Sequence, residues 1–156
     1  MNIQNLPMRD GVGVIILNKK DKVYVGKRKD KPVNDWQMPQ GGVDEGEDYI
    51  TAMKRELLEE TSIQNIKIIK EIDKIYQYEL PENLIGVIWK GKYRGQKQKW
   101  FIASFLGEEK EINLNTKHAE FIDWKWIEPK LLPEIIVNFK KDLYLNLLKE
   151  INLVIG

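Results

Sequence analysis

The sequence contains no cysteine, and His118 is the only histidine among its 156 residues. The missing cysteine excludes disulfide bonds, zinc–thiolate sites and a cysteine nucleophile, and it fits a reducing compartment. No apolar run approaches the roughly 20 residues that a membrane-spanning helix needs, and the first residues lack the apolar region of a signal peptide. We therefore expect a cytoplasmic protein without contact with a membrane.

An excess of charge of either sign is also lacking. The 25 Lys and Arg residues nearly balance the 24 Asp and Glu residues, which leaves a net charge of +1. Any contact with nucleic acid must then be local, and no DNA partner is expected. Hydrophobic residues at 42% and charged residues at 31% are ordinary for a globular protein. The length predicts one domain over residues 1–156.

The hydrophobic pattern predicts strands and two helices in mixed order. Strands are predicted at 11–17, 23–28, 36–39, 66–78, 85–89, 100–106 and 121–127. One helix is predicted over residues 48–61. A C-terminal amphipathic helix is predicted after Pro129, with apolar residues at Leu132, Ile136, Phe139, Leu143 and Leu147. Residues 90–99 and 107–120 are predicted to be connections. This order predicts an α/β sandwich, of the α+β type, with a mixed sheet between helices.

The most unusual stretch covers residues 41–63, GGVDEGEDYITAMKRELLEETSI. Glu56, Glu59 and Glu60 place three carboxylates within five residues of the predicted helix. Like charges at this spacing destabilise an isolated helix, so a cation is expected to offset them. Hard cations such as Mg²⁺ take oxygen ligands and often accompany phosphates. The stretch therefore favours a metal-dependent enzyme acting on a phosphorylated substrate over a merely solvated acidic helix face.

The same stretch resembles the Nudix box, G-x5-E-x7-R-E-U-x-E-E-x-G-U, where U is a bulky aliphatic residue. The matching positions are Gly41, Glu47, Arg55, Glu56, Leu57, Glu59, Glu60 and Ile63. Ser62 stands where the family has glycine, in the turn after the helix, where a left-handed conformation favours glycine. Serine adopts that conformation at modest cost, and no ligand is lost.

The resemblance covers most of the chain and narrows to a subgroup. WQMPQGG before the box, GQKQKWF at 95–101, EFIDWKW at 120–126 and VNFKKDLY at 137–144 are similar to bacterial RNA pyrophosphohydrolases and dinucleoside polyphosphate hydrolases. This implies a Nudix-like α/β/α sandwich with a mixed sheet. It also implies cleavage of a phosphoanhydride bond, either in a 5′-triphosphate or diphosphate RNA end or in a diadenosine polyphosphate. The sequence leaves both substrates open.

The resemblance further implies a metal site. Glu56 and Glu60 are expected ligands, Glu59 a ligand or water-orienting base, and a carbonyl near Gly41 a further ligand. Glu120 aligns with an additional glutamate of the subgroup, as a metal ligand or general base. Mg²⁺ is the expected cofactor, and Mn²⁺ is expected to substitute for it.

Two other residues of the box are expected to support the ligands. Arg55 would pair with a box carboxylate and orient it. Glu47 is either a metal contact or an acid that the positive end of the helix favours.

Seven residues outside the box are candidates for substrate binding. The cations that could meet phosphates are Arg9, Arg28, Lys97 and Lys99, with Lys140 near the 5′ phosphates or the second nucleotide. The aromatic residues that could stack on a base are Tyr78 and Phe139. Lys97 and Lys99 alternate with glutamines, so they could instead form the solvent face of a strand, and Phe139 could instead pack in the core.

Two rival functions remain. One is a catalytically inactive Nudix-fold module that binds a nucleotide or an RNA end. The other is a scaffolding protein in which the acidic helix is only surface. Every carboxylate of the box is present, which favours the enzyme.

Overall fold

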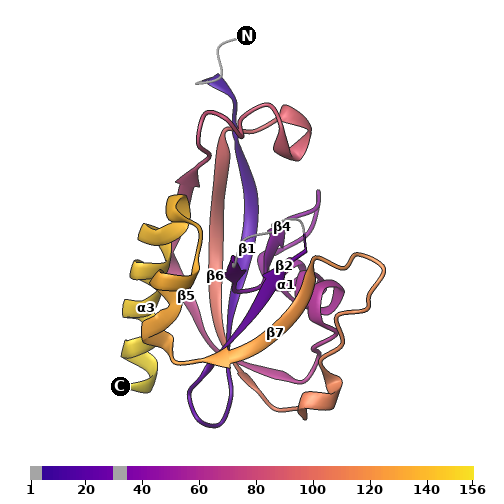
Figure 1. The fold of residues 1–156 in the computed structure, drawn as a ribbon, viewed down its shortest axis with the longest axis vertical. Helices are drawn as coiled ribbons and strands as arrows, with labels where there is room; N and C mark the ends of the chain where they lie inside the picture. The colour runs from indigo at the N-terminus through magenta and orange to yellow at the C-terminus, as the bar shows by residue number, and fades with distance from the viewer. Residues whose placement is uncertain (1–4, 30–34) are drawn as a thin grey trace.

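The computed structural model describes residues 5–29 and 35–156. Within these ranges a seven-stranded sheet has the order β3-β2-β1-β6-β5, with β4 paired to β1 and β7 paired to β2. The strands are β1 Met8–Leu17, β2 Val23–Arg28, β3 Trp36–Gln37, β4 Gln40–Gly42, β5 Ile66–Glu79, β6 Gly95–Phe105 and β7 Phe121–Ile127. The helices are α1 Tyr49–Thr61, α2 Leu132–Ile135 and α3 Lys141–Ile155. Figure 1 shows α1 and α3 on opposite sides of the central strands, which confirms the predicted α/β/α sandwich.

The sheet is mixed, as predicted. The central strands β1 and β6 run parallel, with pairs from Met8↔Gly95 to Leu17↔Ser104. Every other pair of described strands is antiparallel. A parallel pair needs a long connection between its strands. Here the connection between β1 and β6 contains α1 and the stretch 41–63 that resembles the Nudix box.

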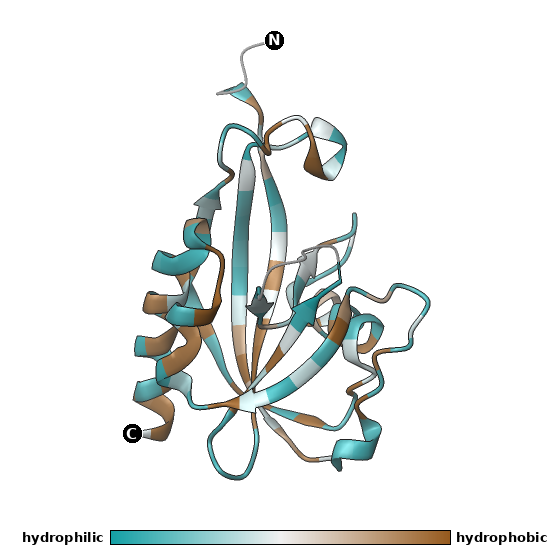
Figure 2. Cartoon of the chain, viewed as in Figure 1, coloured by the Kyte–Doolittle hydropathy of each residue, from teal (hydrophilic) through white to brown (hydrophobic). Residues whose placement is uncertain are grey.

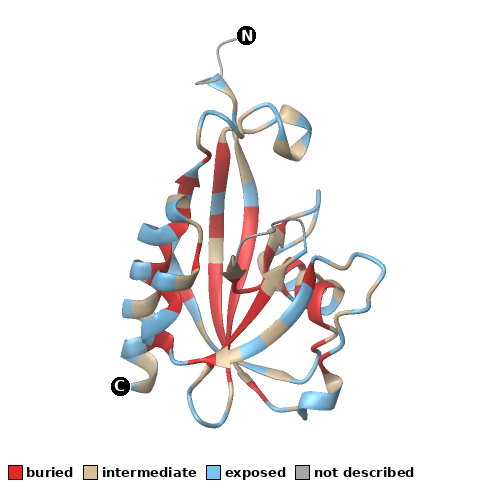
Figure 3. Ribbon diagram, in the orientation of Figure 1, coloured by how far each residue is buried: buried red, intermediate tan, exposed pale blue. Residues whose placement is uncertain are grey.

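Two hydrophobic cores cover the two faces of the sheet. Along β6, Trp100 packs toward Tyr144 of α3, whereas the next residue, Phe101, packs toward Met53 and Leu57 of α1. This follows from the alternation of side chains along a strand. Figure 3 shows buried residues along the central strands and exposed residues on the outer turns of α3, and Figure 2 shows the hydrophobic residues gathered in the lower part of those strands. Among the described helices, none has the length and apolarity needed to cross a bilayer.

Helix α1 begins and ends with caps that the sequence encodes. The side chain of Asp48 accepts a hydrogen bond from the Thr51 amide at 2.7 Å, as helix N-caps do. At the other end Ser62 adopts φ 67° and its amide donates to the Leu58 carbonyl. Its hydroxyl donates to the Asn113 carbonyl at 2.8 Å. Serine therefore takes the left-handed conformation expected of the glycine that the box normally has.

Three predictions about the elements are wrong. Residues 85–89 do not form a strand, because they lie in turns that lead into a 3₁₀ helix at Ile88–Gly91. Residues 95–99 belong to β6 and not to a connection. The C-terminal helix is broken: after α2, Ile136 is extended at φ −90° and ψ 152°, and α3 begins only at Lys141. Apolar residues on both sides of the break face the sheet, so the helical periodicity conceals it.

The connection after β6 is fastened to the end of α1 by Glu111. Its Oε2 accepts hydrogen bonds from the amides of Gln64 and Asn65 at 2.8 and 3.0 Å, and its Oε1 accepts one from the Asn65 side chain at 2.5 Å. Burial raises the pKa of Glu111, but the hydrogen bonds from Asn65 and Gln64 outweigh it and hold the pKa below its ordinary value. The ionised carboxylate is therefore the form that stabilises the fold.

We expect Glu111→Gln to lower Tm by about 2–4 °C at neutral pH, since a partly exposed charged hydrogen-bond acceptor contributes about 1 kcal/mol here. The folded-state pKa is depressed, so this stabilisation is present above the ordinary pKa of glutamate and is lost as pH falls through the folded value. Thermal unfolding followed by circular dichroism between pH 3 and pH 7 tests this. The two melting curves should converge at acidic pH, and a constant gap would contradict the prediction.

Candidate active site

A cleft of about 500 Å³ lies at the centre of the molecule, where β1, β2, β4 and α1 meet β5 and the segment before α3. Eight residues predicted from the sequence line it: Arg9, Arg28, Gly41, Glu56, Tyr78, Glu120, Phe139 and Lys140. These residues are spread over more than 130 positions of the chain. Their convergence makes this cleft the candidate site.

Glu56 and Glu120 form the acidic end of the cleft, and Glu60, which does not line the cleft, is buried close to both of them. Glu60 is 1% exposed, and in the described part of the chain neither oxygen of its carboxylate has a hydrogen-bond partner. Burial, and then the nearby carboxylates of Glu120 and Glu56, raise the pKa of Glu60 well above its ordinary value, whereas Arg28 acts in the opposite direction. Burial also raises the pKa of Glu56. Glu60 is thus a buried acid whose neighbours are further acids.

This arrangement fits a divalent cation. A buried carboxylate without hydrogen-bond donors is costly unless a positive charge accompanies it. Gly41 lies against Glu56 so closely that a Cβ would overlap the carboxyl group, which keeps a backbone next to the acids. Across residues 5–29 and 35–156, no three acidic or histidine side chains form a ready-made ligand set. Mg²⁺ commonly binds through only one or two carboxylates together with water and substrate phosphates, and Glu56 and Glu60 are the residues here that fit that role.

Arg55 holds the carboxylates of the motif in place. Its guanidinium pairs with both oxygens of Glu47, at 2.7 and 2.9 Å. It also donates to Glu56 Oε1 at 2.9 Å, to Glu59 Oε2 at 3.3 Å and to the Gly42 carbonyl at 2.9 Å. The hydrogen bond from Arg55 is the main reason why the pKa of Glu47 falls to about 2. Glu47 therefore orients Arg55, and the helix N-cap is the next residue, Asp48.

The other end of the cleft combines aromatic rings with cations. The rings of Tyr78 and Phe139 lie 5.7 Å apart at 46°, and Lys140 Nζ lies 5.2 Å from the centre of the Tyr78 ring. The Gln37 side-chain oxygen accepts from Arg28 Nη1 at 3.4 Å and from Lys140 Nζ at 3.5 Å. Tyr78 is 6% exposed, so Phe139, which is half-buried, is the more open of the two rings.

Arg9 forms a third wall of the cleft. Its guanidinium lies 5.1 Å from the centre of the Trp89 ring, within the range of a cation–π contact. It also packs on Gly42, where a Cβ would overlap it. Trp89 has φ 52° and Lys90 has φ 58°, a backbone conformation that is rare for a bulky residue. The Arg9 guanidinium thus contacts both the Trp89 ring and the backbone of Gly42.

Comparison of the sequence with models of known protein families identifies the family of this chain. The family model described as NUDIX domain matches residues 7–147. The chain belongs to the Nudix family. Proteins of this family typically depend on a divalent metal, which agrees with the buried carboxylate of Glu60, for which the described residues provide no hydrogen-bond donor.

Among curated relatives, the chain is 59% identical over 143 residues to an RNA pyrophosphohydrolase of Pelagibacter ubique, covering 92% of this chain and 90% of that protein. It is 46% identical over 147 residues to an RNA pyrophosphohydrolase of Sphingopyxis alaskensis, covering 93% of each. The subgroup suggested by the motifs outside the Nudix box is therefore confirmed.

Solved structures share the fold at low sequence identity. The E. coli dihydroneopterin triphosphate pyrophosphohydrolase gives a TM-score of 0.72 at 20% identity, over 92% of this chain and 99% of that one. A C. elegans Ap4A hydrolase gives 0.65 at 23% identity, over 90% and 95%. At such identity the likeness supports the Nudix fold alone.

The structure places two predicted phosphate-binding residues outside the Nudix cleft. Lys97 is exposed, and Lys99 Nζ lies 3.8 Å from Glu71 Oε1 on the neighbouring strand β5. Both point to the α1 face of β6, whereas the cleft lies on the face that carries Trp100. The alternation of side chains along the strand leaves the lysines on the wrong side.

On the face of β6 that borders the cleft, the same segment instead places two glutamines, which the sequence did not predict as site residues. Gln96 accepts from the Tyr78 hydroxyl at 3.1 Å and from Gln98 at 2.9 Å, and Gln98 in turn accepts from the Trp100 indole at 2.9 Å. The Gln96 amide donates to the Gly41 carbonyl at 3.5 Å. This buried chain of amides ties the floor of the cleft to the backbone beside the acids. The burial expected of Trp100 was the signal that could have found it.

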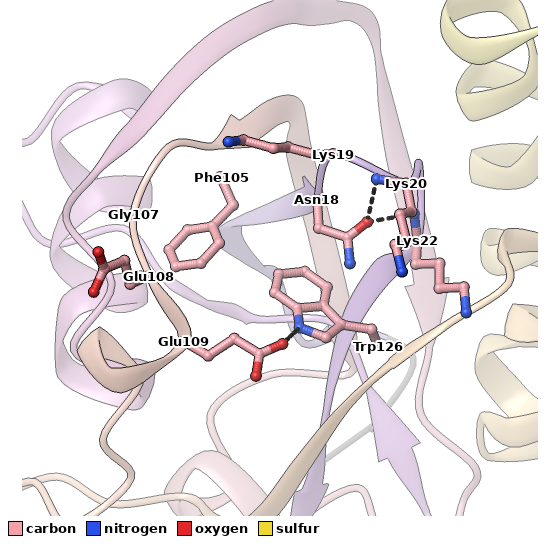
Figure 4. Close-up of a pocket in the computed structure, with 9 residues that line it drawn as sticks. All are labelled: Asn18, Lys19, Lys20, Lys22, Phe105, Gly107, Glu108, Glu109 and Trp126. Carbon is pink, nitrogen blue, oxygen red and sulfur yellow. Dashed lines mark hydrogen bonds between the residues drawn. The ribbon is translucent and has the colours of Figure 1, made fainter.

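A second hollow of about 520 Å³ lies at the turn between β1 and β2, between Lys20 and the rings of Phe105 and Trp126. Figure 4 shows Trp126 donating to Glu109, at 3.0 Å, with the lysines of the turn to one side. None of the predicted site residues lines it. The chemistry of the Nudix motif therefore belongs to the central cleft.

Proposed function

We propose that the chain is an Mg²⁺-dependent RNA pyrophosphohydrolase of the cytoplasm, which cleaves a phosphoanhydride bond at a triphosphorylated or diphosphorylated RNA 5′ end. The observation that carries this proposal is the cleft itself. It joins a cluster of carboxylates to cations and an aromatic ring, in a chain 59% identical to a protein of that name. The two ends suit a metal-bound phosphate chain and the nucleotides attached to it.

In the proposed reaction, water attacks phosphorus, one P–O–P bond breaks, and pyrophosphate or phosphate leaves the RNA. Glu56 and Glu60, with the Gly41 carbonyl, would hold Mg²⁺, which neutralises phosphate charge and activates water when bound. Mn²⁺ would substitute because it prefers the same oxygen ligands. Glu120 lines the cleft and is our proposed proton acceptor. Glu59 faces Arg55 and is our proposed support for the ligands.

The substrate-binding roles follow from charge and position. Arg9 and Arg28 are our proposed phosphate contacts, because arginine forms bidentate hydrogen bonds with phosphate oxygens. Lys140 is 4% exposed and lies beside the two rings, so it would meet the phosphate or base edge of a nucleotide seated on Phe139. Single-stranded RNA ends are commonly bound by such stacking.

A competition experiment tests the substrate. Purified protein with Mg²⁺ receives 5′-triphosphate RNA and a diadenosine polyphosphate, and kcat/KM is measured for each, with 5′-monophosphate RNA as a control that has no anhydride to cleave. We expect a higher kcat/KM for the triphosphate RNA. A higher kcat/KM for the diadenosine polyphosphate would overturn the proposed substrate. Binding of RNA that stays intact on long incubation would favour the inactive module instead.

A further inference from the structure

A third hollow, which is basic, continues from the cleft. It measures about 430 Å³ and is lined by Arg28, Lys29, Lys117, His118, Ala119 and Glu120; we name it the basic groove. Arg28 and Glu120 line the cleft as well, so the two hollows meet at these side chains. The basic groove therefore begins beside the proposed proton acceptor.

Positive charge is concentrated in the basic groove. It carries Arg28, Lys29 and Lys117 against one acid, Glu120, in a chain whose overall net charge is only +1. Lys29 and Lys117 are exposed, and neither forms an ion pair in the described part of the chain. Both are thus available to an anionic ligand from outside.

Hydrogen bonds fasten the segment 116–120, which contains residues of the groove, to α1 and to Lys29 just after β2. The Thr116 hydroxyl donates to the Glu59 carbonyl at 2.5 Å, the Ala119 amide donates to the Thr116 carbonyl at 3.3 Å, and the Lys29 amide donates to the Glu120 carbonyl at 2.9 Å. These bonds keep Lys117 and Lys29 at a fixed place relative to the acids. The charge is therefore built into the site and is not carried by a loose tail.

We propose that the basic groove binds phosphate groups of the RNA substrate beyond those held in the cleft. The proposal rests on the proposed function. The cleft measures about 500 Å³, so the later phosphates of an RNA chain lie outside it. Lysines bind such phosphates by releasing counterions. The phosphates could come from the downstream backbone or from the departing pyrophosphate, since both present the same anionic oxygens.

The test is the double variant Lys29→Ala/Lys117→Ala on 5′-triphosphate RNAs of two and of ten nucleotides. If the groove binds the backbone, KM for the longer RNA rises several-fold, KM for the dinucleotide stays unchanged, and the slope of log(kcat/KM) against log[salt] weakens by about 0.7 for each lost contact. If it binds pyrophosphate, both lengths respond alike and added pyrophosphate inhibits the variant less than the wild type. Either result supports phosphate binding in the groove.

The matched control is Lys19→Ala/Lys20→Ala, which removes two lysines at the β1–β2 turn (Figure 4). We expect it to behave as the wild type. Equal effects in both double variants, or no effect in Lys29→Ala/Lys117→Ala on either RNA or on pyrophosphate inhibition, would overturn the proposal. Should the wild type leave both RNAs intact, the proposed function fails, and fluorescence anisotropy of a labelled ten-nucleotide RNA then decides the groove separately.

Discussion

Replacing Glu60 by glutamine is expected to lower kcat about a thousandfold while the protein remains folded. Glutamine keeps the size and shape of the side chain but removes the charge that would hold the cation. A metal ion contributes several kcal/mol to stabilising charge at a phosphoryl transition state, and each 1.36 kcal/mol lost is about tenfold in rate. Of the predicted ligands, Glu60 is fully buried and has neighbouring acids in place of donors.

Thermal unfolding distinguishes a lost ligand from a damaged fold. Without metal, we expect Glu60→Gln to melt above the wild type, because it removes a buried charge that no hydrogen-bond donor of the described chain satisfies. With Mg²⁺, the wild type should gain stability because the cation binds only the folded state, and the variant should not. Glu45→Gln, an exposed acid of the loop before α1, is the matched control and should retain both activity and the Mg²⁺ shift. Near-normal kcat in Glu60→Gln would refute the ligand role.

Many residues of this site could be predicted because they lie close together in the sequence, at spacings that a single helix brings to one side. Glu56 and Glu60 are one helical turn apart, so a helix alone brings them to one side. The position that follows the helix requires a left-handed residue, and Ser62 provides it at φ 67°. Glu120, by contrast, comes from a distant connection, and only the resemblance to a known family pointed to it.

The rest depended on tertiary choices that local spacing does not encode. In the segment 95–101 the strand exposes either lysines or glutamines to the cleft, and the choice is made by which face of Trp100 is buried. Charge favoured Lys97 and Lys99 as phosphate contacts, but packing of Trp100 against Tyr144 turned the glutamines inward. Trp89 was missed because its turn, with positive φ at two successive residues, follows no periodic pattern.

Replacing Arg55 by alanine is expected to reduce kcat/KM by about 10- to 100-fold, the usual range for residues that orient metal ligands. The guanidinium joins Glu47, Glu56 and Glu59 to the Gly42 carbonyl. Without it, three carboxylates lose their shared cation and repel one another. Glu56 would then leave its position beside Gly41, and the apparent Mg²⁺ affinity would fall together with the rate. Lys54→Ala, which removes the exposed neighbouring cation of α1, is the matched control and should remain close to the wild type.

Arg55→Lys separates the charge of this residue from its geometry. Lysine restores one positive charge near the acids, so it should recover most of the thermal stability that alanine loses. It cannot restore the paired hydrogen bonds to both oxygens of Glu47 while also reaching Glu56 and the Gly42 carbonyl, because only the planar guanidinium has donors arranged for all of them. We therefore expect Tm to recover but kcat/KM and Mg²⁺ affinity to stay low. Full recovery of kcat/KM in the lysine variant would mean that Arg55 acts by charge alone, and an alanine variant within twofold of the wild type would exclude both roles.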